Sequence, residues 1–227
     1  MNIFHPPNHK GKTATDIIKL SIFESIGYFH RAVSWLDLFE RSNSWPTLLY
    51  ACIEGRYGIE YLLFEELVLG TGLTLSRQDY ERCVKEPTSL KKLINKIIPN
   101  YKKLKQFTEA VAHFMPELPP IISWEPNDLM RSWGELSSLL HWCGNRLETV
   151  ENEECKKEAL KKAKAVLLPI WEKINSGRSA CMTPENMKPK VHKIWLQFKE
   201  DKIDIESVED QLKLLDPDYK IHVKKKP

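Results

Sequence analysis

Apolar side chains recur every three or four residues between Thr15 and Leu69, and only the polar run at residues 42–44 interrupts them. This is the spacing of helices that bury one face, so it predicts two long helices, over residues 15–41 and 46–69. Only 9 glycines occur among the 227 residues. That is about half of the usual share of roughly 7%, which argues against a sandwich or barrel with many tight turns. The sequence therefore predicts an all-α fold.

The rest of the chain carries further segments with helical spacing. They are expected over residues 76–85, 88–98, 104–115, 128–150, 153–175, 189–200 and 205–215. Asn127 is the expected cap of the helix that begins at residue 128, and Pro169 is expected to kink or break its own helix. Each helix must bury its apolar stripe against a neighbour, which predicts an antiparallel helical bundle.

Three regions are expected along the chain. Pro6 and Pro7 disfavour a helix at the N-terminus, so residues 1–12 are expected to form an extended arm. Residues 13–177 are expected to form the helical bundle. The more charged residues 178–227 are expected to form a small helical appendage that ends in a basic tail.

The charges of the chain nearly balance, with 34 basic and 31 acidic side chains and a net charge of +3. This is too small for a general attraction to nucleic acid, which usually requires a clustered basic face. The five cysteines are scattered and form no Cys-x-x-Cys pair, so neither a disulfide framework nor a structural zinc site is expected. No apolar run approaches the roughly 20 residues of a membrane span. We therefore expect a cytoplasmic, reduced protein without a metal or a cofactor.

Arg56 lies among the apolar positions of the helix predicted over residues 46–69, and Glu60 follows one turn later. A partly buried guanidinium requires a carboxylate, and the four-residue spacing allows the two side chains to pair. The pair either fixes the packing of the helix or anchors a ligand. Gly55 and Gly58 flank Arg56 and would allow the close approach of another helix or of a ligand.

The segment RSWGELSSLLHWCGNR, residues 131–146, places His141 at the edge of the apolar face of its predicted helix. An imidazole titrates near neutrality, and an arginine beside it would stabilise an anionic transition state. His141 with an arginine therefore suits phosphodiester cleavage. The alternative is a packing histidine whose hydrogen bonds are satisfied within the protein. Trp142, the next residue, is a candidate outward-facing anchor for a partner.

The sequences YACIEGRYGIEYLLFEEL, at residues 50–67, and RSWGELSSLLHW, at residues 131–142, together resemble the HEPN superfamily of helical bundles. The resemblance covers roughly residues 13–150. It implies a long antiparallel helix pair, which often dimerises in that superfamily. Many members are metal-independent ribonucleases of toxin–antitoxin or antiviral defence systems.

Catalytic members of that superfamily carry an arginine a few residues before a histidine on a late helix. In this sequence nine residues lie between Arg131 and His141, and Arg146 follows the histidine. The resemblance therefore implies the fold and a binding role, with the chemistry degraded or absent.

A basic run beside Tyr101 includes Lys102 and Lys103. Such a run could contact the phosphates of RNA. The alternative is a solvated helix face without a ligand. RNA binding without cleavage is thus one functional hypothesis.

Two other hypotheses concern the helices that carry Arg56 and His141. The first is a non-enzymatic helical interaction module, a homodimer or bound to another protein, as a degenerate HEPN-like member of a defence or toxin–antitoxin system. The second is an endoribonuclease in which His141 acts as the base and Arg131 or Arg146 holds the phosphate.

Overall fold

The computed structural model describes residues 24–70, 101–114, 121, 123–141, 152–176, 182, 184 and 187–215. The regular elements in these ranges are the helices α2 (Ser25–Ser42), α3 (Trp45–Gly70), α6 (Tyr101–His113), α7 (Pro126–Leu140), α9 (Glu153–Asn175), α10 (Pro189–Lys199) and α11 (Ile205–Leu215). This confirms the all-α fold. The expected arm at residues 1–12, the helices expected over residues 76–98 and the basic tail lie outside the described ranges. No helix within these ranges is long and apolar enough to cross a membrane.

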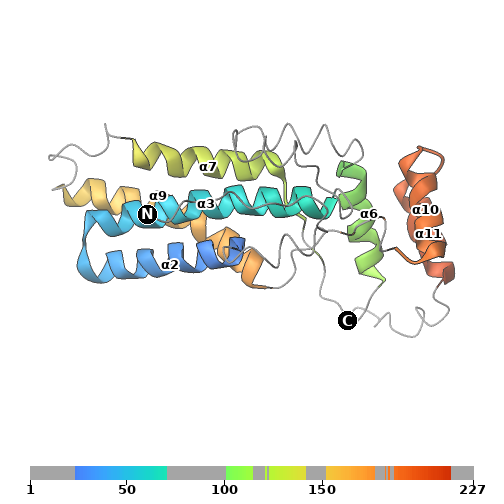
Figure 1. Ribbon diagram of the computed structural model, residues 1–227, viewed down its shortest axis with the longest axis horizontal. Helices are drawn as coiled ribbons and strands as arrows, with labels where there is room; N and C mark the ends of the chain where they lie inside the picture. Colours follow the sequence, from blue (N-terminus) through green and yellow to red (C-terminus); the bar gives the residue numbers. More distant parts are fainter. Residues whose placement is uncertain are drawn as a thin grey trace, which may run out of the picture.

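Four of the helices form a bundle around α3. Figure 1 shows α2, α3, α7 and α9 lying along one another, and α3 contacts each of the other three. The reason lies in the sequence of α3, which is apolar on nearly all of its sides, so that one neighbouring helix cannot bury it. The most deeply buried large side chains of this bundle core are Phe29, Leu36, Leu48, Ile59, Leu63, Leu67, Leu136 and Leu167.

The helices α6, α10 and α11 pack on one another around a second core, at one end of the molecule (Figure 1). Phe107 lies at its centre, with its ring 5.4 Å from that of Trp195 and 6.2 Å from that of Phe198. The expected division of the chain placed the helix at residues 104–115 in the bundle. In the structure most of the apolar face of α6 packs on the C-terminal helices, and Tyr101 at its start joins the bundle core, because an apolar stripe fixes which face is buried but not which helix covers it.

The ends of α7 differ from the expectation. The helix begins at Pro126, and Glu125 rather than Asn127 occupies the cap position. A proline is well tolerated in the first helical turn, where its missing N–H has no partner to lose. The helix ends at Leu140, well before residue 150, and residues 142–150 lie outside the described part of the chain.

Pro169 does not break α9, which extends without interruption from Glu153 to Asn175. Pro169 and Ala165 are both exposed. The carbonyl of Ala165, which loses its helical donor to the proline ring, can therefore bind water. Of the two expected effects of Pro169, a kink or a break, the break is wrong for this reason.

The two glycines beside Arg56 allow close helix packing. A Cβ atom built on Gly58 would lie 2.8 Å from Cε2 of Phe29 in α2. A Cβ atom on Gly55 would lie 2.9 Å from Cδ1 of Leu136 in α7 and would also overlap Leu167 in α9. The two glycines were expected to allow the close approach of either another helix or a ligand. The structure shows the close approach of neighbouring helices.

Candidate functional site

Arg56 and Glu60 form the ion pair that their spacing predicts, with 4.0 Å between Nη2 and Oε1. Trp133 of α7 completes the cluster. Its indole Nε1 donates a hydrogen bond of 2.8 Å to Glu60, and the guanidinium of Arg56 lies over its ring, 4.4 Å from the centroid. The three side chains therefore join α3 to α7, although the buried Nε of Arg56 has no hydrogen-bond partner among the described residues.

Of the residues expected for phosphodiester cleavage, the two that the structure describes do not converge. His141 is exposed and follows the last residue of α7, and Arg131 is exposed and pairs with Asp128 at 3.1 Å. Ten residues of helix separate the backbones of Arg131 and His141 by ~15 Å along the axis. Arg146, the other expected phosphate ligand, and Trp142, the expected partner anchor, lie outside the described residues.

The two lysines of the basic run have different surroundings. Lys102 is exposed. The ammonium of Lys103 pairs with Asp201 at 2.6 Å and donates to the carbonyl of Lys199 at 3.0 Å, at the C-terminal end of α10. Lys103 thus neutralises the negative end of that helix, and Lys102 is the better placed of the two for a phosphate.

A strip of aromatic and apolar side chains, three of them exposed and three half-buried, runs along α2 and α3. We call it the ring face, and it consists of Tyr28, Trp35, Tyr50, Ile53, Tyr57 and Tyr61. Helical spacing aligns Tyr50, Ile53 and Tyr57 on one side of α3, where they remain 49%, 37% and 50% exposed. Side chains of this size are normally buried, so three in a row at the surface indicate a contact surface.

Ring contacts between the two helices hold the ring face in place. The ring of Tyr28 lies 5.9 Å from that of Tyr57 and 5.0 Å from that of Tyr61. The ring of Trp35 lies 5.1 Å from that of Tyr50. Rings that already contact one another lose little conformational entropy on binding, which favours the use of this surface for recognition.

The charged side chains beside the ring face, Arg31 and Glu54, neutralise one another. Arg31 pairs with Glu54 at 2.9 Å, and its guanidinium lies 4.6 Å from the ring centroid of Tyr28. Burial raises the pKa of Tyr28 to about 12, so its hydroxyl is neutral at physiological pH. The surface is therefore aromatic and without a net charge from these groups.

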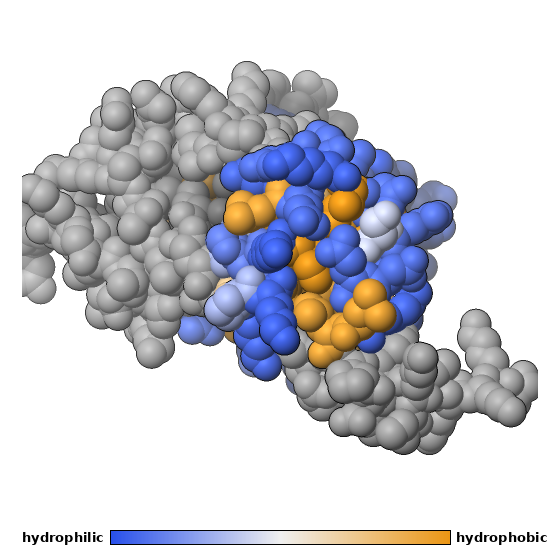
Figure 2. All heavy atoms as spheres, turned by 90° about the vertical axis from the view of Figure 1, so that its right-hand side faces the viewer, coloured by the Kyte–Doolittle hydropathy of each residue, from blue (hydrophilic) through white to orange (hydrophobic). Residues whose placement is uncertain are grey.

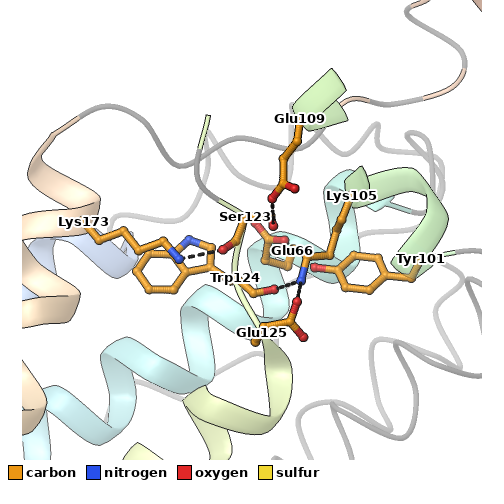
Figure 3. A network of polar contacts seen from close by, with 8 residues as sticks. All are labelled: Glu66, Tyr101, Lys105, Glu109, Ser123, Trp124, Glu125 and Lys173. Carbon is orange, nitrogen blue, oxygen red and sulfur yellow. Dashed lines mark hydrogen bonds and ion pairs between the residues drawn. The ribbon is translucent and has the colours of Figure 1, made fainter. Parts of the chain in front are cut away.

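A network of polar side chains connects the two cores (Figure 3). The buried ammonium of Lys105 in α6 contacts the carbonyl of Trp124 and the carboxylate of Glu125, just before α7. The hydroxyl of Tyr101, also in α6, donates to the buried carboxylate of Glu66 in α3. These contacts bind α6, and with it the second core, to the bundle.

Lys173 of α9 extends the same network. Its ammonium donates a hydrogen bond of 2.6 Å to the carbonyl of Ser123 and lies 3.9 Å from the ring centroid of Trp124. The hydroxyl of Ser123 in turn donates to Glu109 of α6. Burial lowers the pKa of Lys173 and raises that of Glu66. The network places the charges of Glu66 and Lys105 in the protein interior, whereas Glu109 and Glu125 at its edge are exposed.

The sequence signal for this network was the pair of glutamates, Glu65 and Glu66, inside the apolar run of α3. The ring face had no separate signal, because its residues have the same types as a core. Among the described residues, no group of three or more His, Cys, Asp or Glu side chains is placed to hold a metal ion. Comparisons with family models, with curated proteins and with solved structures found no match for this chain.

Proposed function

We propose that this protein is a non-enzymatic helical interaction module that pairs with a second copy of itself through the ring face. The observation that carries the proposal is the exposure of Tyr50, Ile53 and Tyr57 on one side of α3. The resemblance to the HEPN superfamily supports such pairing and extends the proposal to a defence or toxin–antitoxin system. The free thiols of Cys52 and Cys155 agree with a cytoplasmic location, which forms part of the proposal.

The size of the ring face fits a small contact between two copies. Its part on α3, from Tyr50 to Tyr61, is ~16 Å long. In a two-fold dimer the same surface is used twice, so that twelve large side chains meet. Covering the parts of them that are still exposed would remove roughly 800 Å² from water, which places the contact among the weak, transient interfaces.

The chemistry of the ring face favours a protein over a nucleic acid. Tyrosine, tryptophan and isoleucine are anchors of protein interfaces. A surface for RNA would instead require unpaired basic side chains among the rings. Here Arg31 is engaged by Glu54, and Arg56 is engaged by Glu60 and Trp133.

Sedimentation equilibrium of the full chain tests the proposal. The wild type is expected to dimerise, and the variant carrying Tyr50→Ser, Ile53→Ser and Tyr57→Ser is expected to dissociate at least about tenfold more readily. The three positions are exposed, so the variant should keep the helical circular dichroism of the wild type.

A matched control carries three substitutions on the exposed side of α9, Lys157→Ser, Lys161→Ser and Glu172→Ser. It is expected to sediment like the wild type. A monomeric wild type, or a ring-face variant that associates as strongly as the wild type, would refute the proposal.

The alternative is an endoribonuclease that uses His141 with Arg131 or Arg146. The exposure of the His141 imidazole, which leaves it accessible to a strand of RNA, favours this alternative. Incubation of the protein with a mixed RNA pool separates the two functions. Under our proposal the wild type and the His141→Ala variant both leave the RNA intact, whereas cleavage that depends on His141 would replace the proposal with the enzyme.

A further inference from the structure

The helices α10 and α11 form an antiparallel hairpin at the end of the molecule, and each carries an exposed stripe of different charge. On α10 the stripe consists of Lys193, Leu196 and Lys199. On α11 it consists of Glu206, Asp210 and Leu214. Leu196 is 40% and Leu214 82% exposed. Figure 2 shows the resulting surface, on which apolar side chains lie between hydrophilic ones.

The charge separation extends over both helices. The sequence of α10 contains three lysines and no acidic residue, whereas that of α11 contains three acidic residues and one lysine. Within the described part of the chain, Lys193, Lys199 and Glu206 take part in no ion pair. Asp210 pairs with Lys213 of its own helix at 2.8 Å, and such an exposed pair contributes little to stability.

We propose that this surface, which we call the end face, binds the end face of a second copy of the chain. A two-fold axis along the helices would place the basic α10 of one copy over the acidic α11 of the other, twice in each dimer. A two-fold axis across the helices would instead place α10 over α10 and α11 over α11. The charges therefore select the first arrangement and oppose the second.

The spacing of the side chains fits this arrangement. Lys193 and Lys199 are ~9 Å apart along α10, and Glu206 and Asp210 are ~6 Å apart along α11. The long lysine side chains can span the difference. Leu196, midway between the two lysines, then faces the interval between the two acidic residues.

The end face is small, since each helix of 11 residues is ~16 Å long. A contact of this size falls among weak, transient interfaces. Its charged groups are at the surface, so its strength should fall as salt screens them. The contact involves none of the residues of the ring face and does not depend on the proposed function.

A charge exchange tests the end face with the full chain. An acidic variant carries Lys193→Glu and Lys199→Glu, and a basic variant carries Glu206→Lys and Asp210→Lys. Each variant repels its own copies, because both of its helices then carry the same sign. A mixture of the two restores opposite charges at every contact. We expect each variant alone to associate at least about tenfold more weakly than the parent chain, and the mixture to regain the association.

The experiment is carried out by sedimentation velocity at low and at high salt, both in the wild type and in the ring-face variant. In the second background the ring face cannot contribute, so failure of one proposal is distinguishable from failure of the other. In the ring-face background, association of the acidic variant equal to that of its parent, or a mixture that associates no better than its components, would overturn the end-face proposal. Association of the ring-face variant itself that does not weaken from low to high salt would overturn it as well.

Discussion

Glu65 of α3 accepts two hydrogen bonds from Ser25, the first residue of α2, one from the backbone N–H at 2.8 Å and one from the hydroxyl at 2.6 Å. Glu24, in the cap position of α2, provides no side-chain cap of its own. A residue 40 positions away thus supplies the acceptor for the first N–H of the helix, and its carboxylate lies at the positive end of the helix dipole. Although burial raises the pKa of Glu65, both bonds to Ser25 oppose that shift.

Glu65→Ala should lower the free energy of unfolding by about 1–2 kcal/mol, because the backbone N–H and the hydroxyl of Ser25 lose their acceptor. Urea denaturation followed by circular dichroism measures the change. Glu24→Ala is the matched control, since this exposed neighbour makes no cap hydrogen bond, and it should leave the stability nearly unchanged. Equal losses for the two variants would contradict the capping role.

Glu66→Gln should reduce the dependence of stability on pH. The pKa of Glu66 is raised from 4.5, first by burial and also by Glu65, against the opposing effects of Tyr101, Lys105 and Lys173. The folded protein therefore holds this proton to a higher pH than the unfolded chain does. The resulting stabilisation is complete below pH 4.5 and is lost as the pH rises through the folded-state pKa.

Free energies of unfolding of the wild type and the Glu66→Gln variant, measured from about pH 4.5 to neutrality, check this prediction. The difference between the two proteins should shift in favour of the variant as the pH rises, because the amide cannot ionise but can still accept a hydrogen bond from Tyr101. Glu172→Gln, at an exposed position of α9, is the control. Parallel curves for wild type and Glu66→Gln would show that Glu66 has an ordinary pKa.

Gly58→Ala should destabilise the protein by about 1–3 kcal/mol, because the added methyl group overlaps the buried ring of Phe29. Gly134→Ala offers a control within the same bundle. A Cβ atom at Gly134, which is exposed on α7, meets no heavy atom within 4 Å. That substitution should be neutral or stabilising by up to about 1 kcal/mol, since alanine favours a helix more than glycine does. In thermal melts, Gly58→Ala should therefore have a lower melting temperature than the wild type, and Gly134→Ala an equal or higher one.

Leu63→Ala and Leu136→Ala should each cost roughly 2–5 kcal/mol, because both side chains are fully buried in the bundle core. Leu38→Ala, at a position of α2 that is 36% exposed, should cost clearly less. Chemical denaturation gives the three values. A neutral result at Leu63 or Leu136 would contradict the assigned core.

Helix positions were predictable from sequence where an apolar stripe ended at a clear break. The prediction of 46–69 corresponds to Trp45–Gly70, and the predictions of 153–175 and 205–215 agree with α9 and α11. Asn152 explains one of these boundaries, since its side chain accepts from two N–H groups at the start of α9. The start of α7 was missed because Asn127 and Pro126 are both good residues for a helix start, and the proline determined the outcome.

Contacts between distant residues were less predictable. The pairing of Arg56 with Glu60 followed from their spacing on one helix, but Trp133, 73 positions from Glu60, had no local signal. The same holds for Lys103, whose ion pair with Asp201 depends on how α6 packs against α10. For the ring face, the period of α3 cannot specify which side stays exposed, because nearly every side is apolar.

The polar network around Lys105 and Glu66 determines where the molecule can unfold locally. Helices α6, α10 and α11 share a hydrophobic core of their own. The ring of Tyr101 packs into the bundle core, and hydrogen bonds and an ion pair connect α6 to the bundle as well. This contact between the two cores can open locally while each hydrophobic core stays buried. Amide protons of the three helices should therefore exchange with deuterium as one cooperative block, ahead of those in the centre of α3.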